Sequence, residues 1–228
     1  MRIKFIAPII LACAAIAAAQ GPWPQERQDQ RERMVLNEDG GQAFLILPAD
    51  VSLVGLVKPG QTTVSDFSQY SVFLGPGWSN GPLRAREERL SKVLSTIRNH
   101  AQMDEVTQAG IGNRFGPTFS LEKLDVAGDR NIGDLQIQDV LAGLFNDGQL
   151  GDPQSDAVYF VFLDPSLHST LRSLTAGKHY LAYHSFFSVA GARIHYAVVP
   201  YQPDPQVGYQ TALRTLIVSA LHTNDASH

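Results

Sequence analysis

Short apolar runs alternate with turn-forming residues along most of the chain. Each run is bounded by Gly, Pro, Asp or another polar residue, a pattern typical of short β-strands. The run at 157–163 consists entirely of apolar residues and predicts a central strand that is covered on both faces. The last two runs are close enough in sequence to form a hairpin. The expected strands are residues 43–47, 51–57, 71–74, 157–163, 179–187 and 194–201.

Other segments repeat their apolar residues with the period of an α-helix, and these cover residues 82–101, 134–147 and 209–221. In the first segment, Leu90 and Leu94 share one face, while charged residues such as Arg86 fall on the opposite, solvated face. The second segment starts at Asp134, a good N-cap residue, and Gly148 can supply the left-handed residue that ends it.

The order of these elements predicts an α/β fold. The strand at 71–74, the glycine-rich loop after it and the following helix form half of a strand–helix–strand unit. We therefore expect a single α/β domain over residues 38–228, with a mixed β-sheet and flanking helices. The preceding segment, residues 20–37, is polar, charged and rich in Gln, and we interpret it as a leader or linker.

The first 19 residues have the organisation of a secretory signal peptide. Arg2 and Lys4 precede an apolar run over residues 5–16, and small residues follow up to Ala19. This run is too short to span a bilayer, which requires about 20 apolar residues, and no later run approaches that length. We expect a secreted or periplasmic protein of bacterial type. As an alternative, Cys13 is a lipid-attachment site and the protein is anchored through it.

Composition and charge narrow the classes of function. Hydrophobic residues make up 44% of the chain and charged residues 18%, which indicates a packed core rather than general disorder. Eighteen Lys and Arg stand against 22 Asp and Glu, and this acidic balance argues against nucleic acid as a partner. Cys13 is the one cysteine of the sequence, so a disulfide framework and a multi-cysteine metal cluster are excluded.

The loop at 75–82 joins a strand to a helix and is rich in glycine. Phosphate-binding loops present several backbone N–H groups at a helix N-terminus. Two prolines remove such groups here, and the glycine spacing fits neither nucleotide-binding fingerprint. An ordinary connecting turn is the simpler interpretation. Trp78 in this loop is either an exposed platform for stacking a sugar or a residue that closes the edge of the core.

Asp164 follows the central apolar strand, and ligands of α/β sheets gather at the carboxyl ends of strands. With Ser166 and His168 it supplies the residue types of a hydrolytic triad. Three members within one short loop rarely align, however, and no G-x-S-x-G motif accompanies them. The alternative is that Asp164 caps a short helix beginning at Pro165.

His179, His184 and His195 form the densest group of candidate metal ligands. Neutral imidazoles that converge on one ion would make a zinc site, usually completed by a further His or a carboxylate. In a regular strand His179 and His184 point to opposite faces, and the strand register that would place His195 is not fixed by sequence. Half-buried histidines that form hydrogen bonds within a sheet explain the same residues.

Four segments carry a resemblance to a known family. They are an aspartate at the start of a helix (134–138), an apolar strand ending in Pro (159–165), a Tyr-His-Ser-aromatic strand (183–187) and the strand at 196–201. Together they resemble the bacterial branch of the exordium-like, phosphate-induced protein family. The resemblance implies a protein of the cell exterior without a firmly assigned reaction. Several bacterial members carry a Ser-His-Glu segment that looks like a metal site, whereas here Ser227-His228 matches only its start.

These observations leave three functions open. The first is an exported α/β domain with a binding or cell-envelope role, because no candidate catalytic group is better supported than its structural alternative. The second is a secreted metal-dependent hydrolase, with His179, His184 and His195 as zinc ligands and Asp164 as the base. The third is a module built around Trp78 and surface tyrosines that binds a cell-wall glycan.

Overall fold

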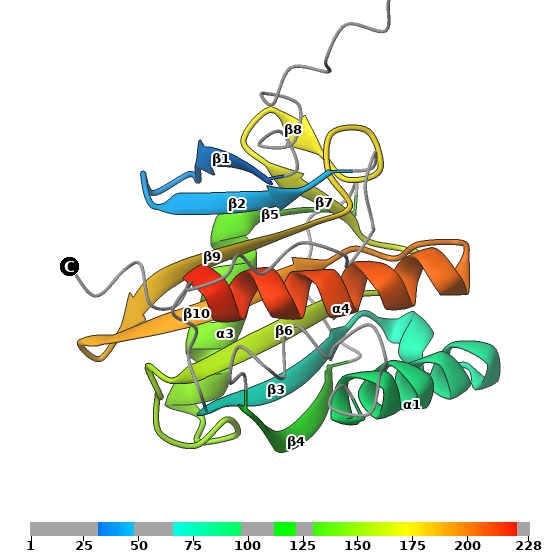
Figure 1. Ribbon diagram of the computed structural model, residues 1–228, viewed down its shortest axis with the longest axis horizontal. Coiled ribbons are helices and arrows are strands. Elements are labelled where there is room, and N and C mark those ends of the chain that lie inside the picture. The colour runs from blue at the N-terminus through cyan, green and yellow to red at the C-terminus, as the bar shows by residue number, and fades with distance from the viewer. Residues whose placement is uncertain (1–31, 48–65, 97–111, 122–129, 223–228) are drawn as a thin grey trace, which may run out of the picture. The chain divides into compact units, whose positions relative to one another are not determined.

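The computed structural model describes residues 32–47, 66–96, 112–121 and 130–222 (Figure 1). They form a mixed seven-stranded sheet, a small three-stranded sheet and flanking helices, so the predicted α/β fold class is confirmed. Several predicted features lie outside the described residues: the signal peptide with Cys13, the strand at 51–57, the end of the first helix at 97–101, and Ser227-His228.

The large sheet combines a parallel half with an antiparallel half. Strands β10, β6, β3 and β4 run parallel, so their carboxyl ends share one edge. The remaining pairs are antiparallel. In spatial order, the strands are β1 (Glu32–Leu36), β2 (Gln42–Ile46), β9 (Ala182–Val189), β10 (Ala192–Val199), β6 (Ala157–Leu163), β3 (Asp66–Leu74) and β4 (Gly112–Leu121).

The hairpin expected from the last two apolar runs is confirmed. Strands β9 and β10 pair antiparallel through a turn at Ala190 and Gly191. Both turn residues have positive φ, 49° and 82°, as a two-residue type I′ turn requires.

Both edges of the sheet are strands that the apolar pattern did not predict. β1 lies inside the segment interpreted as a leader, so the structure differs from that interpretation over residues 32–36. Met34 and Leu36 on this strand are about half exposed, while Val35 between them packs against the core. At the other edge, β4 contains Gly116 and Pro117 opposite a shift in register along β3, which is where an edge strand tolerates proline.

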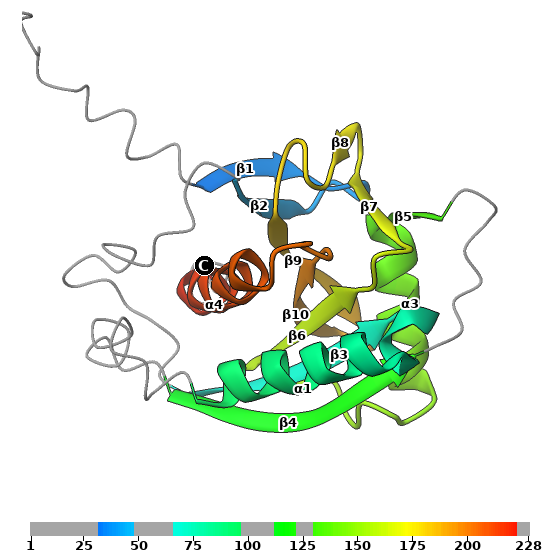
Figure 2. The same cartoon turned by 90° about the vertical axis from the view of Figure 1, so that its right-hand side faces the viewer.

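Helices cover both faces of the sheet. Helices α1 (Gly81–Ser95) and α4 (Pro205–His222) pack on one face, and α3 (Asp134–Asn146) packs on the other. Figures 1 and 2 show α4 and α3 on opposite sides of β9, β10 and β6. Side chains of β6 alternate between the two layers, and all are buried, which confirms the predicted central strand.

The small sheet extends the α3 side of the molecule. It contains β5 (Asn131–Gly133), β7 (His168–Leu171) and β8 (Leu174–Thr175). Strand β5 leads directly into α3, and β7 follows the carboxyl end of β6, so this sheet lies beside the edge at which the parallel strands end.

Helix α3 corrects the predicted role of Asp134. The N-cap is Gly133, whose N–H donates to Oε1 of Gln136 (2.9 Å). Asp134 is instead the first helical residue and is fully buried. The predicted left-handed residue after the helix, Gly148, is confirmed with φ 70°.

The Asp134 carboxylate ties α3 to the sheet. Its Oδ1 accepts hydrogen bonds from the hydroxyls of Tyr183 (2.7 Å) and Tyr196 (2.6 Å), and its Oδ2 accepts one from Nε2 of Gln138 (2.9 Å). Burial raises the pKa of Asp134, and these three hydrogen bonds lower it without cancelling the effect. Burial also holds the pKa of Tyr183 and Tyr196 well above 10, so both phenols remain donors at neutral pH.

The variant Asp134→Asn tests this network. Because the pKa of Asp134 is raised in the folded protein, its contribution to stability is fully present below 3.8 and is lost as pH rises through the folded-state pKa. We expect the free energy of unfolding of the wild type, relative to that of the variant, to fall as pH rises from about 3.8 toward neutrality. Urea denaturation across this range measures the difference.

The exposed Asp139 on the same helix provides the control. In Asp139→Asn, which removes an exposed carboxylate from the same helix, the corresponding change should be smaller than in Asp134→Asn. A wild-type advantage over Asp134→Asn that stays constant or grows with pH would contradict the proposed electrostatics.

Candidate functional site

The parallel strands β3, β6 and β10 end side by side, and the loops that follow them form a crevice. After β3 the chain passes through the short helix η3 (Pro76–Ser79) and α1 toward β4. After β6 it leaves in the opposite direction, toward β9 and β10. The carboxyl ends of β3 and β6 therefore form a topological switch point, which is where open α/β sheets bind their ligands.

Asp164 joins the two loops at this switch point. Its side chain is fully buried. Oδ2 accepts a hydrogen bond from the N–H of Gly77 (2.6 Å), and Oδ1 accepts one from the N–H (2.8 Å) and one from the hydroxyl (2.6 Å) of Ser166. With both oxygens engaged, Asp164 holds the end of β6 against the loop after β3.

The residues that resembled a triad have a different arrangement. The hydroxyl of Ser166 donates to Asp164, and His168 lies on β7 with its side chain exposed. A triad requires the histidine between the serine and the carboxylate. Pro165 and Ser166 form a turn rather than the expected short helix, so Asp164 caps that turn.

The glycines of this loop allow the backbone to approach Asp164. Gly75 has φ 113°, and a Cβ at that position would overlap the Asp164 carboxyl group. A Cβ on Gly77 would lie 2.8 Å from Oδ2 of the same residue. The glycine-rich loop is therefore explained by the close contact with a carboxylate of the protein itself.

Trp78 lies in the core at the end of β3. It is 2% exposed, its Nε1 donates to the carbonyl oxygen of Leu74 (3.1 Å), and its ring packs edge-on against Phe73 (centroids 4.9 Å apart). Of the two interpretations of this residue, the structure places it where it closes the edge of the core, and only part of its surface lines a pocket.

The predicted histidine ligands occupy two separate places. His184 on β9 and His195 on β10 are buried on the face that packs against α4, with stacked rings 5.7 Å apart. His179 precedes β9, and its Nδ1 accepts a hydrogen bond from the N–H of Thr175 (2.9 Å) in a turn. Over the described ranges, no group of three or more His, Cys, Asp or Glu residues is placed to hold a metal ion.

A cavity of about 280 Å³ opens between the small sheet and the end of β10. Its hydrogen-bonding side chains are those of Asn131, His168, Ser169, Thr175 and Tyr201. The other lining residues are Pro165, Leu167, Ala176, Gly177 and Pro200, so the described part of the lining contains no Asp, Glu, Lys or Arg.

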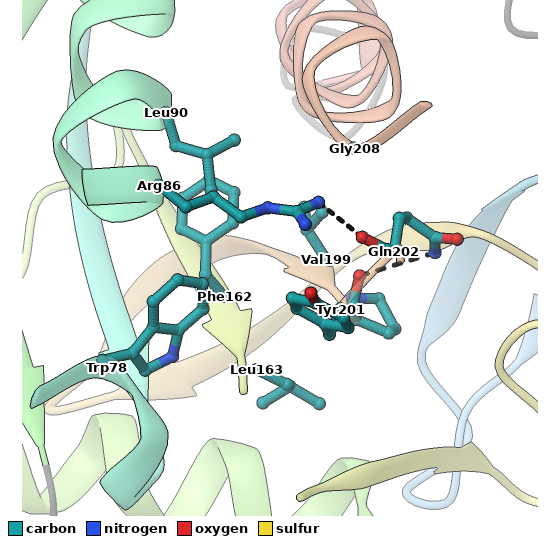
Figure 3. A pocket seen from close by; sticks show the side chains of 10 residues that line it. Trp78, Arg86, Leu90, Phe162, Leu163, Val199, Tyr201, Gln202 and Gly208 are labelled. Carbon is teal, nitrogen blue, oxygen red and sulfur yellow. Dashed lines mark hydrogen bonds between the residues drawn. The ribbon is translucent and has the colours of Figure 1, made fainter. Parts of the chain in front are cut away.

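A second, much narrower pocket lies beside this cavity, between α1, α4 and the end of β10 (Figure 3). It encloses about 10 Å³, which is about the space of one water molecule. Arg86 and Gln202 lie within it, and Pro200 and Tyr201 line both this pocket and the larger cavity.

Sequence reasoning located this edge through Asp164 but missed most of the residues that line the pockets. The sequence pattern places Arg86 on the solvated face of α1, whereas the structure buries it, together with Glu87 beside it. Tyr201 stands at the end of the predicted strand 194–201. Because ligands of α/β sheets gather at the carboxyl ends of strands, the argument that points to Asp164 also points to Tyr201.

Comparison with protein-family models, with curated proteins and with solved structures finds no significant match to this chain. Among the helices of the described ranges, none combines the length and the hydropathy that crossing a membrane would need.

The variant Gly75→Ala tests the contact with Asp164. A Cβ at this position would combine a left-handed backbone with overlap on the carboxyl group, so we expect a loss of about 2–4 kcal/mol in the free energy of unfolding. Gly81→Ala is the matched control, because its added Cβ meets nothing within 4 Å at the start of α1. Urea denaturation of both variants distinguishes them, and equal stabilities would contradict this account.

The buried side chain of His195 should lower the free energy of unfolding in acid. Burial, assisted by the nearby charge of Arg193, lowers the pKa of His195 from 6.5 to about 4. The unfolded chain therefore binds this proton first, and stability should be lost as pH falls from about 6.5 to about 4, by about 3 kcal/mol in all. We expect His195→Gln to lack this part of the pH dependence in urea denaturation, whereas His168→Gln, at an exposed position, should retain it.

Proposed function

We propose that this protein is an exported α/β binding protein of the exordium-like type, and that it holds a small neutral polar ligand, a sugar above all, at the carboxyl edge of its sheet. The observation that carries the proposal is the cavity of about 280 Å³ next to the switch point. Its volume of about 280 Å³ lies just below the range of about 300–1,000 Å³ typical of ligand pockets, which fits a ligand near the size of a sugar ring.

The chemistry of the lining favours a hydroxylated, uncharged ligand. The side chains of Asn131, Ser169, Thr175 and Tyr201 offer both donors and acceptors, and a sugar hydroxyl requires both. Among the lining residues that the structure describes, none carries a carboxylate, ammonium or guanidinium group that would select a charged ligand. The half-buried ring of Tyr201 supplies the flat apolar surface against which a sugar ring packs.

The cavity walls are held in place by their own hydrogen bonds. The hydroxyl of Ser169 is bonded to that of Tyr180 (2.9 Å), and the N–H of Gly177 donates to the carbonyl oxygen of Tyr180 (2.8 Å). The His168 N–H is bonded to the carbonyl oxygen of Arg130 (2.9 Å). A pocket that is ordered before binding loses less entropy when the ligand enters, which supports a binding role.

Two further considerations support this proposal over a metal-dependent hydrolase. His184 and His195 are the two predicted ligands that lie together, whereas three protein ligands are usual for a catalytic zinc ion. Asp164, the proposed base, already accepts three hydrogen bonds. Export and the cell-envelope setting rest on the sequence pattern of residues 1–19 and on the exordium-like resemblance.

Calorimetric titration of the protein with a panel of neutral mono- and oligosaccharides tests the proposal. We expect at least one member to bind, and Tyr201→Ala and His168→Ala to weaken that binding by tenfold or more, because both residues line the cavity. Gln149→Ala is the control, since this exposed residue follows α3 at the opposite edge of the sheet. Absence of heat with every sugar, or equal affinities in all variants, would overturn it.

A further inference from the structure

One wall of the larger cavity is the turn that follows β8. Thr175 ends β8, and together with Ala176 and Gly177 it lines the cavity. The N–H of Ala176 donates to the carbonyl oxygen of Ser169 on β7 (3.0 Å), which attaches the turn to the small sheet. Gly177 has φ 77°, a left-handed conformation that lets the chain reverse its direction here. The shape of this wall therefore depends on how firmly the turn is closed.

His179 closes the turn with two hydrogen bonds, although it is not among the described residues that line the cavity. Its backbone N–H donates to the carbonyl oxygen of Thr175 (2.9 Å), and its ring Nδ1 accepts the N–H of the same residue (2.9 Å). Any residue other than proline can form the first of these bonds. The second requires the imidazole, so the side chain of His179 holds part of the cavity wall in place.

The bond to Nδ1 exists only while the imidazole is neutral. A neutral imidazole has one accepting and one donating nitrogen, so a hydrogen bond into Nδ1 requires the proton to be on Nε2. In the charged form both nitrogens are donors. Two N–H groups would then face each other across 2.9 Å, and the ring of His179 would have to turn away from Thr175. Histidine is the side chain whose charge ordinarily changes between about pH 5 and 8.

The surroundings of His179 do not compensate for the loss of this bond. On the described elements beside the turn, the charged and titratable side chains are those of Lys178, Tyr180, His168, Arg172 and Glu38. The one carboxylate among them, Glu38, accepts the N–H of Arg172 (3.0 Å). Across the described ranges, no carboxylate oxygen lies within 4.0 Å of the ring nitrogens of His179. A protonated ring would therefore gain no ion pair in its present position.

We infer that His179 is a positioning residue for the ligand cavity: its neutral imidazole holds the wall at Thr175 in the binding shape, and its protonated imidazole releases that wall. The identity of the ligand rests on the proposed function, whereas the hydrogen bond between the two residues does not. Ligand affinity should fall in acid by about fivefold, which is the factor that corresponds to one net hydrogen bond. By reciprocity, a bound ligand favours the neutral imidazole, and protonation promotes release of the ligand.

Nitrogen-15 NMR of the full chain without ligand tests the hydrogen bond itself. At pH 7.5 we expect the ring of His179 to carry its proton on Nε2. On acidification, the amide signal of Thr175 should shift with the same midpoint as the ring signals of His179, and its protection against hydrogen exchange should fall. In His179→Asn the amide oxygen can replace Nδ1 as the acceptor, so the protection of Thr175 should not change with pH. A proton on Nδ1 at pH 7.5, or a Thr175 amide insensitive to pH in the wild type, would overturn the inference.

Calorimetric titration with glucose, galactose and cellobiose at pH 7.5 and pH 5 tests the effect on binding. We expect the wild type to bind about fivefold more weakly at pH 5. His179→Asn retains an acceptor at both pH values, and His179→Ala lacks one at both, so each should show a ratio of affinities near one. The matched control is His168→Gln, because His168 lines the cavity and is itself titratable. This variant should keep the fivefold ratio.

The two experiments separate this inference from the proposed function. A pH dependence of binding that persists in His179→Asn and disappears in His168→Gln would assign the effect to His168 and overturn the inference. If Thr175 responds to pH as expected and none of the sugars binds, the role of His179 in the wall is supported and the proposed ligand is overturned.

Discussion

The carboxylate of Asp164 is the contact on which the architecture of the carboxyl edge depends. It fixes the backbone of Gly77, and with it the start of η3, at the end of the central strand. From there the chain turns Trp78 into the core and enters α1, which carries Arg86 to the end of β10. One buried acid thus determines the position of elements that are far apart in the sequence. The cost of burying it is offset by three hydrogen bonds from its neighbours.

The elements that sequence predicted are those whose apolar pattern is continuous. The all-apolar strand β6, helix α3 and helix α4 bury one or both faces. The spacing of their apolar residues therefore indicates both the type of element and the face that is buried. Strands β1 and β4 lie at the sheet edges and pair on one side only, so they need few apolar residues and even accept Pro117. Their existence depends on β2 and β3 offering free edges, which is a property of the assembled sheet.

In the site, too, the sequence predicts features that depend on neighbouring residues, and it does not predict contacts between residues distant in sequence. Asp164 was found because its place after a strand is a local feature, whereas its partner Gly77 lies 87 positions away. Arg86 has the sequence surroundings of a solvated residue and is buried because α4 packs over it. Likewise, proximity in sequence groups His179 with His184, but β9 begins only at Ala182, so His179 lies in a turn.

Tyr201 is a wall common to both pockets, and its ring is covered by the guanidinium of Arg86. Any displacement of this ring alters both volumes at once. The binding of a ligand in the larger cavity would therefore be thermodynamically linked to the packing of Arg86 on Tyr201, so each would change the stability of the other by the same factor.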